Sequence, residues 1–116
     1  MGTRRSVCVL LVAGLHACAE SSVEAVPTET ELAIFTEIVL IEATLQDFSG
    51  PAKDTLAVRY YEQLYDRFGV SPGDLDALRQ RYNADVALWQ AMADSVEARL
   101  QRSQADPSEL LRTPTD

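Results

Sequence analysis

Side chains that can act as nucleophiles or metal ligands are few in this 116-residue chain. The two cysteines are Cys8 and Cys18, and the single histidine is His16, so all three lie close to the beginning of the sequence. A cysteine thiol can form a disulfide, bind a metal ion or carry a covalently attached lipid. Which of these roles Cys18 performs depends on the segment around it.

The segment before Cys18 has the layout of a secretory signal peptide. Arg4 and Arg5 give it a positive start, residues 7–15 are apolar, and small residues surround Cys18. The apolar run is much shorter than the about 20 residues of a membrane-spanning helix. We therefore expect residues 1–17 to direct export and then to be removed.

Two cleavage sites compete at the end of this segment. Ala17, Cys18 and Ala19 fit the small-x-small rule of ordinary signal peptidase, which would release a soluble protein. The motif LHAC at residues 15–18 resembles the bacterial lipobox, in which a leucine, two small residues and an obligatory cysteine direct lipid onto the cysteine sulfur. His16 departs from that pattern, in which a small residue is usual. We favour the lipobox, which makes Cys18 the lipid attachment site.

Removal of residues 1–17 changes the charge and the available ligands. Two of the ten basic residues are lost while all 18 acidic residues stay, so the formal charge falls from -8 to -10. An acidic surface of this kind argues against binding to nucleic acid. Cys8 and His16 are lost as well, which leaves Cys18 without a disulfide partner and the mature chain without cysteine or histidine ligands for a metal. No metal or cofactor is expected.

The remaining sequence predicts one helical domain. Residues 18–27 form an acidic tether, residues 28–104 the domain and residues 105–116, with two prolines, a flexible tail. No segment shows sustained period-two alternation, so no strand is expected. The expected helices cover residues 28–48, 52–68, 72–82 and 86–102. Their short connections favour an all-α bundle of three to four helices.

Capping residues mark the expected helix ends. Thr28 and Glu31 have the spacing of a capping box at the start of the first helix. Gly69 suits a left-handed C-cap after the second helix. Ser71 and Asp85 suit the N-cap positions of the third and fourth helices.

The first helix carries a carboxylate within its apolar face. At about 100° per residue, Glu42 falls beside Phe35 and Ile38. Because an unpaired buried charge is costly, we expect Glu42 to reach the edge of this face or to be a buried polar anchor bonded to a tyrosine, an arginine or a helix N-terminus. An anchor for a ligand or partner and a catalytic carboxylate are the alternatives. General acid–base catalysis usually needs a second positioned group, and none is identifiable.

The second helix concentrates aromatic and basic side chains, namely Arg59, Tyr60, Tyr61, Tyr65 and Arg67. We expect the tyrosines to straddle the edge of the core. The alternative is a partner-binding patch, because tyrosine and arginine are favoured at the energetic centres of interfaces. On the fourth helix, Trp89 is expected in the core rather than as a stacking platform.

Residues 31–100 follow an ordered series of short motifs. The matching positions are Glu37, Ile38, Glu42 and Ala43; Tyr61, Arg67, Gly69, Val70 and Ser71; Tyr82; and Val96, Arg99 and Leu100. In this order and spacing the chain resembles the uncharacterised "domain of unknown function 4296" family of small bacterial lipoproteins. The resemblance implies a lipobox and a helical domain, and it implies no activity because the family has none assigned.

Together these features predict a lipid-anchored, non-catalytic helical module of the bacterial cell envelope. Ala19, rather than an aspartate, follows Cys18, which is typical of lipoproteins released to the outer membrane. We expect the module to face the periplasm and to bind a protein partner, while the acidic stretch CAESSVE keeps cell-surface exposure open. The alternative is a carrier of a small ligand or lipid with an apolar cavity beside the first helix. An enzyme is not expected.

Overall fold

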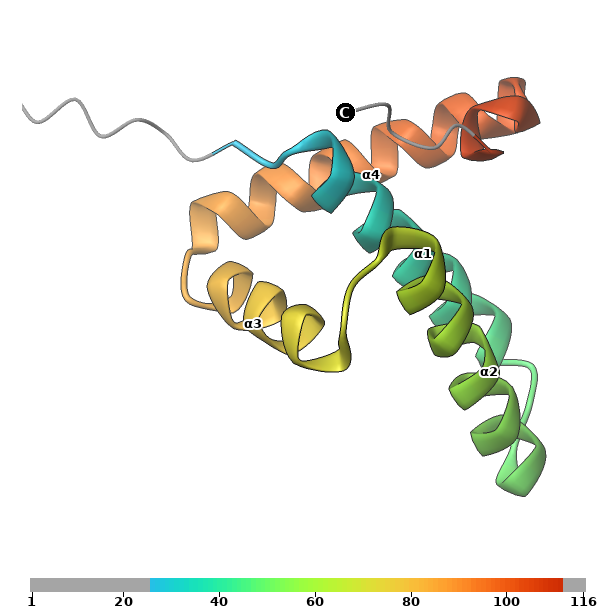
Figure 1. The fold of residues 1–116 in the computed structure, drawn as a ribbon. Helices are drawn as coiled ribbons and strands as arrows, with labels where there is room; N and C mark the ends of the chain where they lie inside the picture. The colour runs from blue at the N-terminus through green and yellow to red at the C-terminus, as the bar shows by residue number, and fades with distance from the viewer. Residues whose placement is uncertain (1–25, 112–116) are drawn as a thin grey trace, which may run out of the picture.

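The structure is a computed structural model that describes residues 26–111, apart from the side chains of residues 109 and 110 (Figure 1). Its elements are α1 (Glu29–Leu45), α2 (Gly50–Phe68), α3 (Pro72–Asn83), α4 (Val86–Ala105) and the short 3-10 helix η1 (Pro107–Leu111). The described residues contain no strand. The prediction of a small all-α bundle is therefore confirmed. The predicted signal peptide and Cys18 lie outside the described residues.

Helix α1 is the central element of the arrangement. It forms an antiparallel hairpin with α2, and α4 crosses the beginning of that hairpin (Figure 1). Helix α3 packs beneath the start of α4. The C-terminal half of α1 therefore has only α2 beside it. Less of the surface of this half is covered than of the N-terminal half.

The N-terminal caps of three helices agree with the sequence. The Thr28 hydroxyl accepts a hydrogen bond from the Glu31 N–H, and the Glu31 carboxylate accepts one from the Thr28 N–H. Ser71 and Asp74 form a second capping box at the start of α3. The Asp85 side chain caps α4. These bonds satisfy backbone donors that a helix end would otherwise leave without partners.

Several helix ends differ from the prediction. The chain leaves α1 at Leu45 through i to i−3 bonds rather than continuing to residue 48. Helix α2 already begins at Gly50, because Pro51 needs no N–H partner in the first turn. Helix α4 continues to Ala105, and residues 107–111 of the expected tail form η1. The end of α2 matches: Gly69 has φ 62°, the left-handed conformation that glycine adopts without strain.

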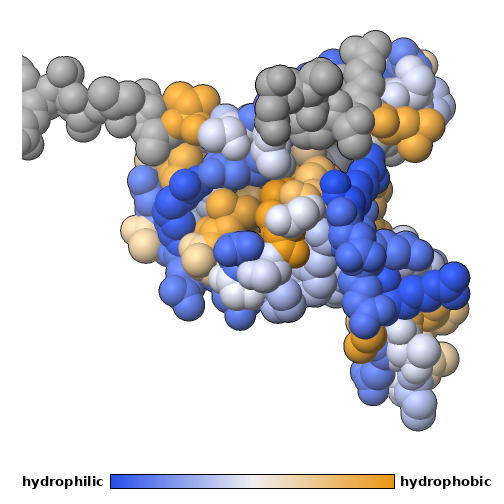
Figure 2. All heavy atoms as spheres, in the orientation of Figure 1, coloured by the Kyte–Doolittle hydropathy of each residue, from blue (hydrophilic) through white to orange (hydrophobic). Residues whose placement is uncertain are grey.

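The hydrophobic core lies where α1, α3 and α4 converge. Figure 2 shows apolar side chains gathered in the hollow framed by these three helices, while the outer surfaces are mostly polar with separate apolar groups. Helix α2 contributes a single buried residue, Leu64. The most deeply buried large side chains are Tyr82, Leu64 and Met92. The Phe35 and Tyr82 rings meet edge to face with their centroids 4.8 Å apart.

Candidate functional site

Four glutamates of α1 make the side-chain hydrogen bonds and ion pairs that connect it to the other helices. Each of the three neighbouring helices receives at least one of these contacts. The pairs are Glu29 with Arg99 of α4, Glu31 with Arg81 and Tyr82 of α3, Glu37 with Arg67 of α2, and Glu42 with Tyr61 of α2. All four of these carboxylates, including Glu42, therefore have partners inside the fold.

The contact between Glu31 and Tyr82 is the most enclosed of the four. Tyr82 is fully buried, and its hydroxyl donates to Glu31 Oε2 at 2.5 Å. Burial and this hydrogen bond raise the pKa of Tyr82 to about 12. Burial alone would raise the pKa of Glu31, but hydrogen bonds from Tyr82 and Arg81 outweigh it and lower that pKa. The sequence indicated Glu31 only as part of a helix cap.

The lowered pKa of Glu31 predicts that acid destabilises the fold. The unfolded carboxyl titrates near its usual pKa of 4.5, and the folded one titrates lower. The stabilisation is therefore fully present above pH 4.5 and is lost as the pH falls through the folded pKa. Glu31→Gln should lower the unfolding free energy at pH 7 by about 1–3 kcal/mol and reduce this pH dependence, as measured by urea denaturation at several pH values. Asp66→Asn, at an exposed position of α2, is the control. If the unfolding free energy of Glu31→Gln depended on pH as that of the wild type does, Glu31 would not be the source of the acid sensitivity.

Glu42 corrects one expectation and supports another. Its side chain accepts a hydrogen bond from the Tyr61 hydroxyl at 2.6 Å, so a tyrosine partner is present as predicted. Of the two positions expected for Glu42, the buried one is wrong, because Glu42 is exposed, as expected for a carboxylate that reaches the edge of the apolar face. It lies on the C-terminal half of α1, where only α2 packs. Burial and the bond to Glu42 raise the pKa of Tyr61, whose hydroxyl also accepts from Arg79 at 3.1 Å.

The aromatic and basic residues of α2 do not form one surface. Tyr60, Tyr61 and Tyr65 are half-buried against the core, as expected for residues at its edge. Arg67 forms an ion pair with Glu37 at 2.8 Å, and Arg59 is exposed. Several members of the predicted partner-binding patch are therefore engaged within the fold, and its role in binding stays a prediction.

Trp89 lies at the surface, so the expectation of a core position is wrong. It is 46% exposed, although its ring meets the buried Phe35 ring edge to face at 5.9 Å between centroids. It borders a groove of about 410 Å³ between α1 and α4, which we call the Trp89 groove. Its apolar lining comes from Phe35, Val39, Trp89, Met92, Ala93, Val96 and Leu100, and its polar lining from Glu97, Gln101 and Gln104. Helical periodicity could not separate Trp89 from core positions, because the crossing of α1 leaves this end of the face open.

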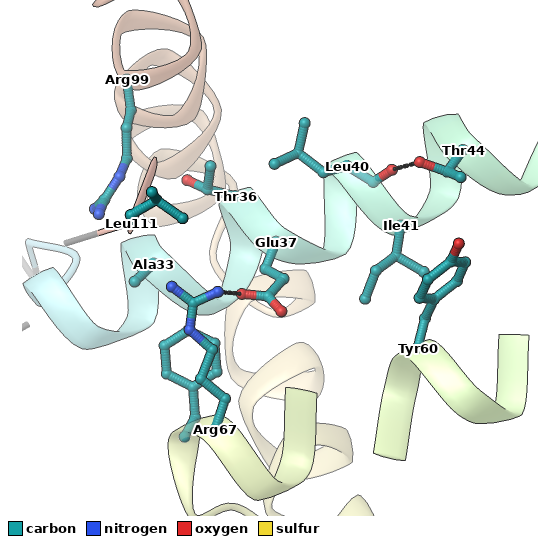
Figure 3. A pocket seen from close by; sticks show the side chains of 11 residues that line it. Ala33, Thr36, Glu37, Leu40, Ile41, Thr44, Tyr60, Arg67, Arg99 and Leu111 are labelled. Atoms are coloured by element: carbon teal, nitrogen blue, oxygen red, sulfur yellow. Dashed lines mark hydrogen bonds and ion pairs between the residues drawn. The ribbon is translucent and has the colours of Figure 1, made fainter. Parts of the chain in front are cut away.

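A second hollow of about 300 Å³, the Arg99 cavity, lies on another side of α1 (Figure 3). Residues of α1, α2, α4 and η1 line it, including Arg67, Arg99 and Tyr60. The Arg99 side chain is 5% exposed and donates to Glu29 Oε1 at 2.7 Å. The sequence carried a signal for this arginine: it shares the buried face of α4 with Met92 and Val96.

No protein-family model, no curated protein and no solved structure matches the chain. Within residues 26–111, no helix combines the length and apolar character needed to cross a membrane. The same residues contain no group of three or more histidine, cysteine, aspartate or glutamate side chains placed to hold a metal ion. The Trp89 groove and the Arg99 cavity both have larger volumes than a third hollow of about 230 Å³, which Glu31 and Arg81 help to line.

Proposed function

We propose that the protein is a lipid-anchored, non-catalytic helical module of the bacterial cell envelope that binds a protein partner through the Trp89 groove. The lipid is attached at Cys18, and the domain faces the periplasm from the outer membrane. This role agrees with the resemblance of residues 31–100 to a family of small bacterial lipoproteins.

The exposed tryptophan is the observation that carries the proposal. A contiguous apolar groove on the surface of a small domain is typical of an interaction site. Tryptophan is among the residues most favoured at the energetic centre of an interface, where it fills a pocket and excludes water. Trp89 is held from beneath by Phe35 and is accessible from outside, so it is placed to act as such an anchor.

The charge around the groove indicates the chemistry of the partner. Its lining includes Glu97 and no basic residue, and the whole chain has a formal charge of -8. Opposite charges at the rim of an interface speed association and reject wrong partners. We therefore assign to the groove a partner segment with apolar side chains flanked by lysine or arginine.

The ionisable side chains of α1 support a binding role over a catalytic one. Their carboxylates contact arginine and tyrosine side chains of the other helices and thereby hold the bundle together. A catalytic acid or base must instead be within reach of a substrate proton. The groove itself contains a single ionisable side chain, Glu97.

Site-specific photo-cross-linking in intact cells tests the proposal. A benzophenone amino acid at Gln101, inside the groove, should give a cross-linked adduct with a partner. The same probe at the exposed Glu62 of α2 should give none. Trp89→Ser should reduce the Gln101 adduct at least tenfold, because the aromatic anchor is lost. Equal adducts from both positions, or a Gln101 adduct that survives Trp89→Ser, would contradict a partner in the groove.

A further inference from the structure

Arg99 has more hydrogen-bond donors than the fold uses. A guanidinium group has five N–H donors, and Glu29 is the one acceptor that Arg99 contacts within residues 26–111. Every fully buried side-chain nitrogen and oxygen of the described residues has a partner. The remaining nitrogens of Arg99 must therefore keep contact with open space, and the Arg99 cavity is the space that this side chain lines.

The cavity has a polar end and an apolar end. Figure 3 shows the guanidinium groups of Arg99 and Arg67 approaching the same part of α1, near Ala33, from the α4 side and the α2 side. Farther along α1 the lining comes from Leu40, Ile41 and Thr44, with Tyr60 of α2, and the Thr44 hydroxyl donates to the Leu40 carbonyl. A molecule in this space would meet positive charge at one end and a mainly apolar surface at the other.

The charge of this cavity differs from that of the rest of the molecule. Arg67 and Arg99 outnumber Glu37 in its lining, and Glu37 is itself paired with Arg67. By contrast, the Trp89 groove has only an acidic side chain among its ionisable residues. The partner of Arg99, Glu29, is 65% exposed, so water weakens its ability to neutralise a nearly buried guanidinium. An anion inside the cavity would accept hydrogen bonds from those Arg99 nitrogens that do not bond to Glu29.

We propose that the Arg99 cavity binds an anionic amphiphile. Its carboxylate or phosphate head would accept hydrogen bonds from Arg99, with Arg67 nearby, because the planar guanidinium matches the geometry of both anions. Its short hydrocarbon chain would lie along Leu40 and Ile41. The cavity volume of about 300 Å³ is at the lower end of the range for small-molecule sites, roughly 300–1,000 Å³. This site is separate from the Trp89 groove and does not depend on the proposed protein partner.

Calorimetric titration with three eight-carbon probes tests the proposal. The protein carries Cys18→Ala so that it can be purified without lipid or detergent. Octanoate or octyl phosphate should bind at least tenfold more tightly than octanol, which has the same number of carbon atoms and no charge. Tighter binding of octanoate would indicate that the ligand is a fatty carboxylate. Tighter binding of octyl phosphate would indicate that it has a phosphate headgroup. Octanol binding as tightly as both anions would overturn the proposal.

Two substitutions separate ligand binding from the ion pair. Arg99→Gln and Glu29→Gln both break the Glu29–Arg99 pair, but only Arg99→Gln removes the guanidinium. We expect Arg99→Gln to abolish the preference for the anions and Glu29→Gln to preserve or strengthen it. Leu40→Asp, at a 38% exposed position of the apolar end, should weaken anion binding at least tenfold if Arg99→Gln does not fold. The proposed site would be contradicted if folded Arg99→Gln, or Leu40→Asp, bound octanoate and octyl phosphate as tightly as the wild type does.

Discussion

Tyr82→Ala is expected to lower the unfolding free energy by about 3–5 kcal/mol, the range for removal of a buried aromatic side chain. Tyr82 is fully buried and packs against Phe35. Its hydroxyl also connects the end of α3 to Glu31 of α1. The unfolding free energy of a native domain is about 5–15 kcal/mol. If that of the wild-type bundle is about 5 kcal/mol, a loss of this size would leave the variant largely unfolded. Urea denaturation followed by far-UV circular dichroism measures the effect.

Tyr82→Phe is the matched control for that substitution. It keeps the ring and removes only the hydrogen bond to Glu31, so we expect a cost of about 0.5–1.5 kcal/mol. A Tyr82→Ala variant within 1 kcal/mol of wild type would contradict the central place of this residue in the core. The result also bears on the Trp89 groove, because Phe35 contacts both Tyr82 and Trp89. Loss of Tyr82 should therefore also disturb the floor of the groove.

Cys18→Ala is expected to move the protein almost completely from the membrane fraction to the soluble fraction of the periplasm. The substitution removes the sulfur that we propose carries the lipid. It leaves alanines at positions 17, 18 and 19, which fit ordinary signal peptidase. Release from the membrane should follow, because the proposed lipid anchor is lost with the sulfur. Cell fractionation followed by immunoblotting measures the shift.

Cys8→Ala supplies the control for the anchor. Cys8 lies in the segment that is expected to be removed, so this variant should remain in the membrane fraction. Wild-type protein found free in the periplasm would contradict the anchor. Membrane retention of Cys18→Ala after its signal peptide has been cut would contradict it as well.

The course of the chain was predictable because its signals are local. Thr28, Ser71 and Asp85 cap helices through bonds to residues three positions away, and Gly69 ends α2 in a left-handed conformation. Such interactions depend on neighbours in the sequence and hold whatever the tertiary structure is. Two of the misplaced helix ends involve Pro51 and the final turn of α1, and a third is the end of α4; small local preferences decide such boundaries.

Burial was less predictable, because it depends on how the helices cross. Glu42 and Trp89 both lie on apolar helix faces, yet α4 covers only the first half of α1, and neither residue is buried. The contacts between α1 and the other helices join residues far apart in the sequence, as for Glu31 and Tyr82 or Glu29 and Arg99. Periodicity gives the face on which a residue lies and leaves open which helix packs against that face.

The proposed role depends on the anchor at Cys18, so the mass of the mature protein tests it most directly. The protein is extracted from the membranes of its bacterium and examined by intact and tandem mass spectrometry. We predict a chain that begins at Cys18 and carries lipid on the cysteine sulfur. A chain that begins at Glu20 without lipid, as cleavage after Ala19 would produce, would contradict the anchor. So would a chain that still begins at Met1.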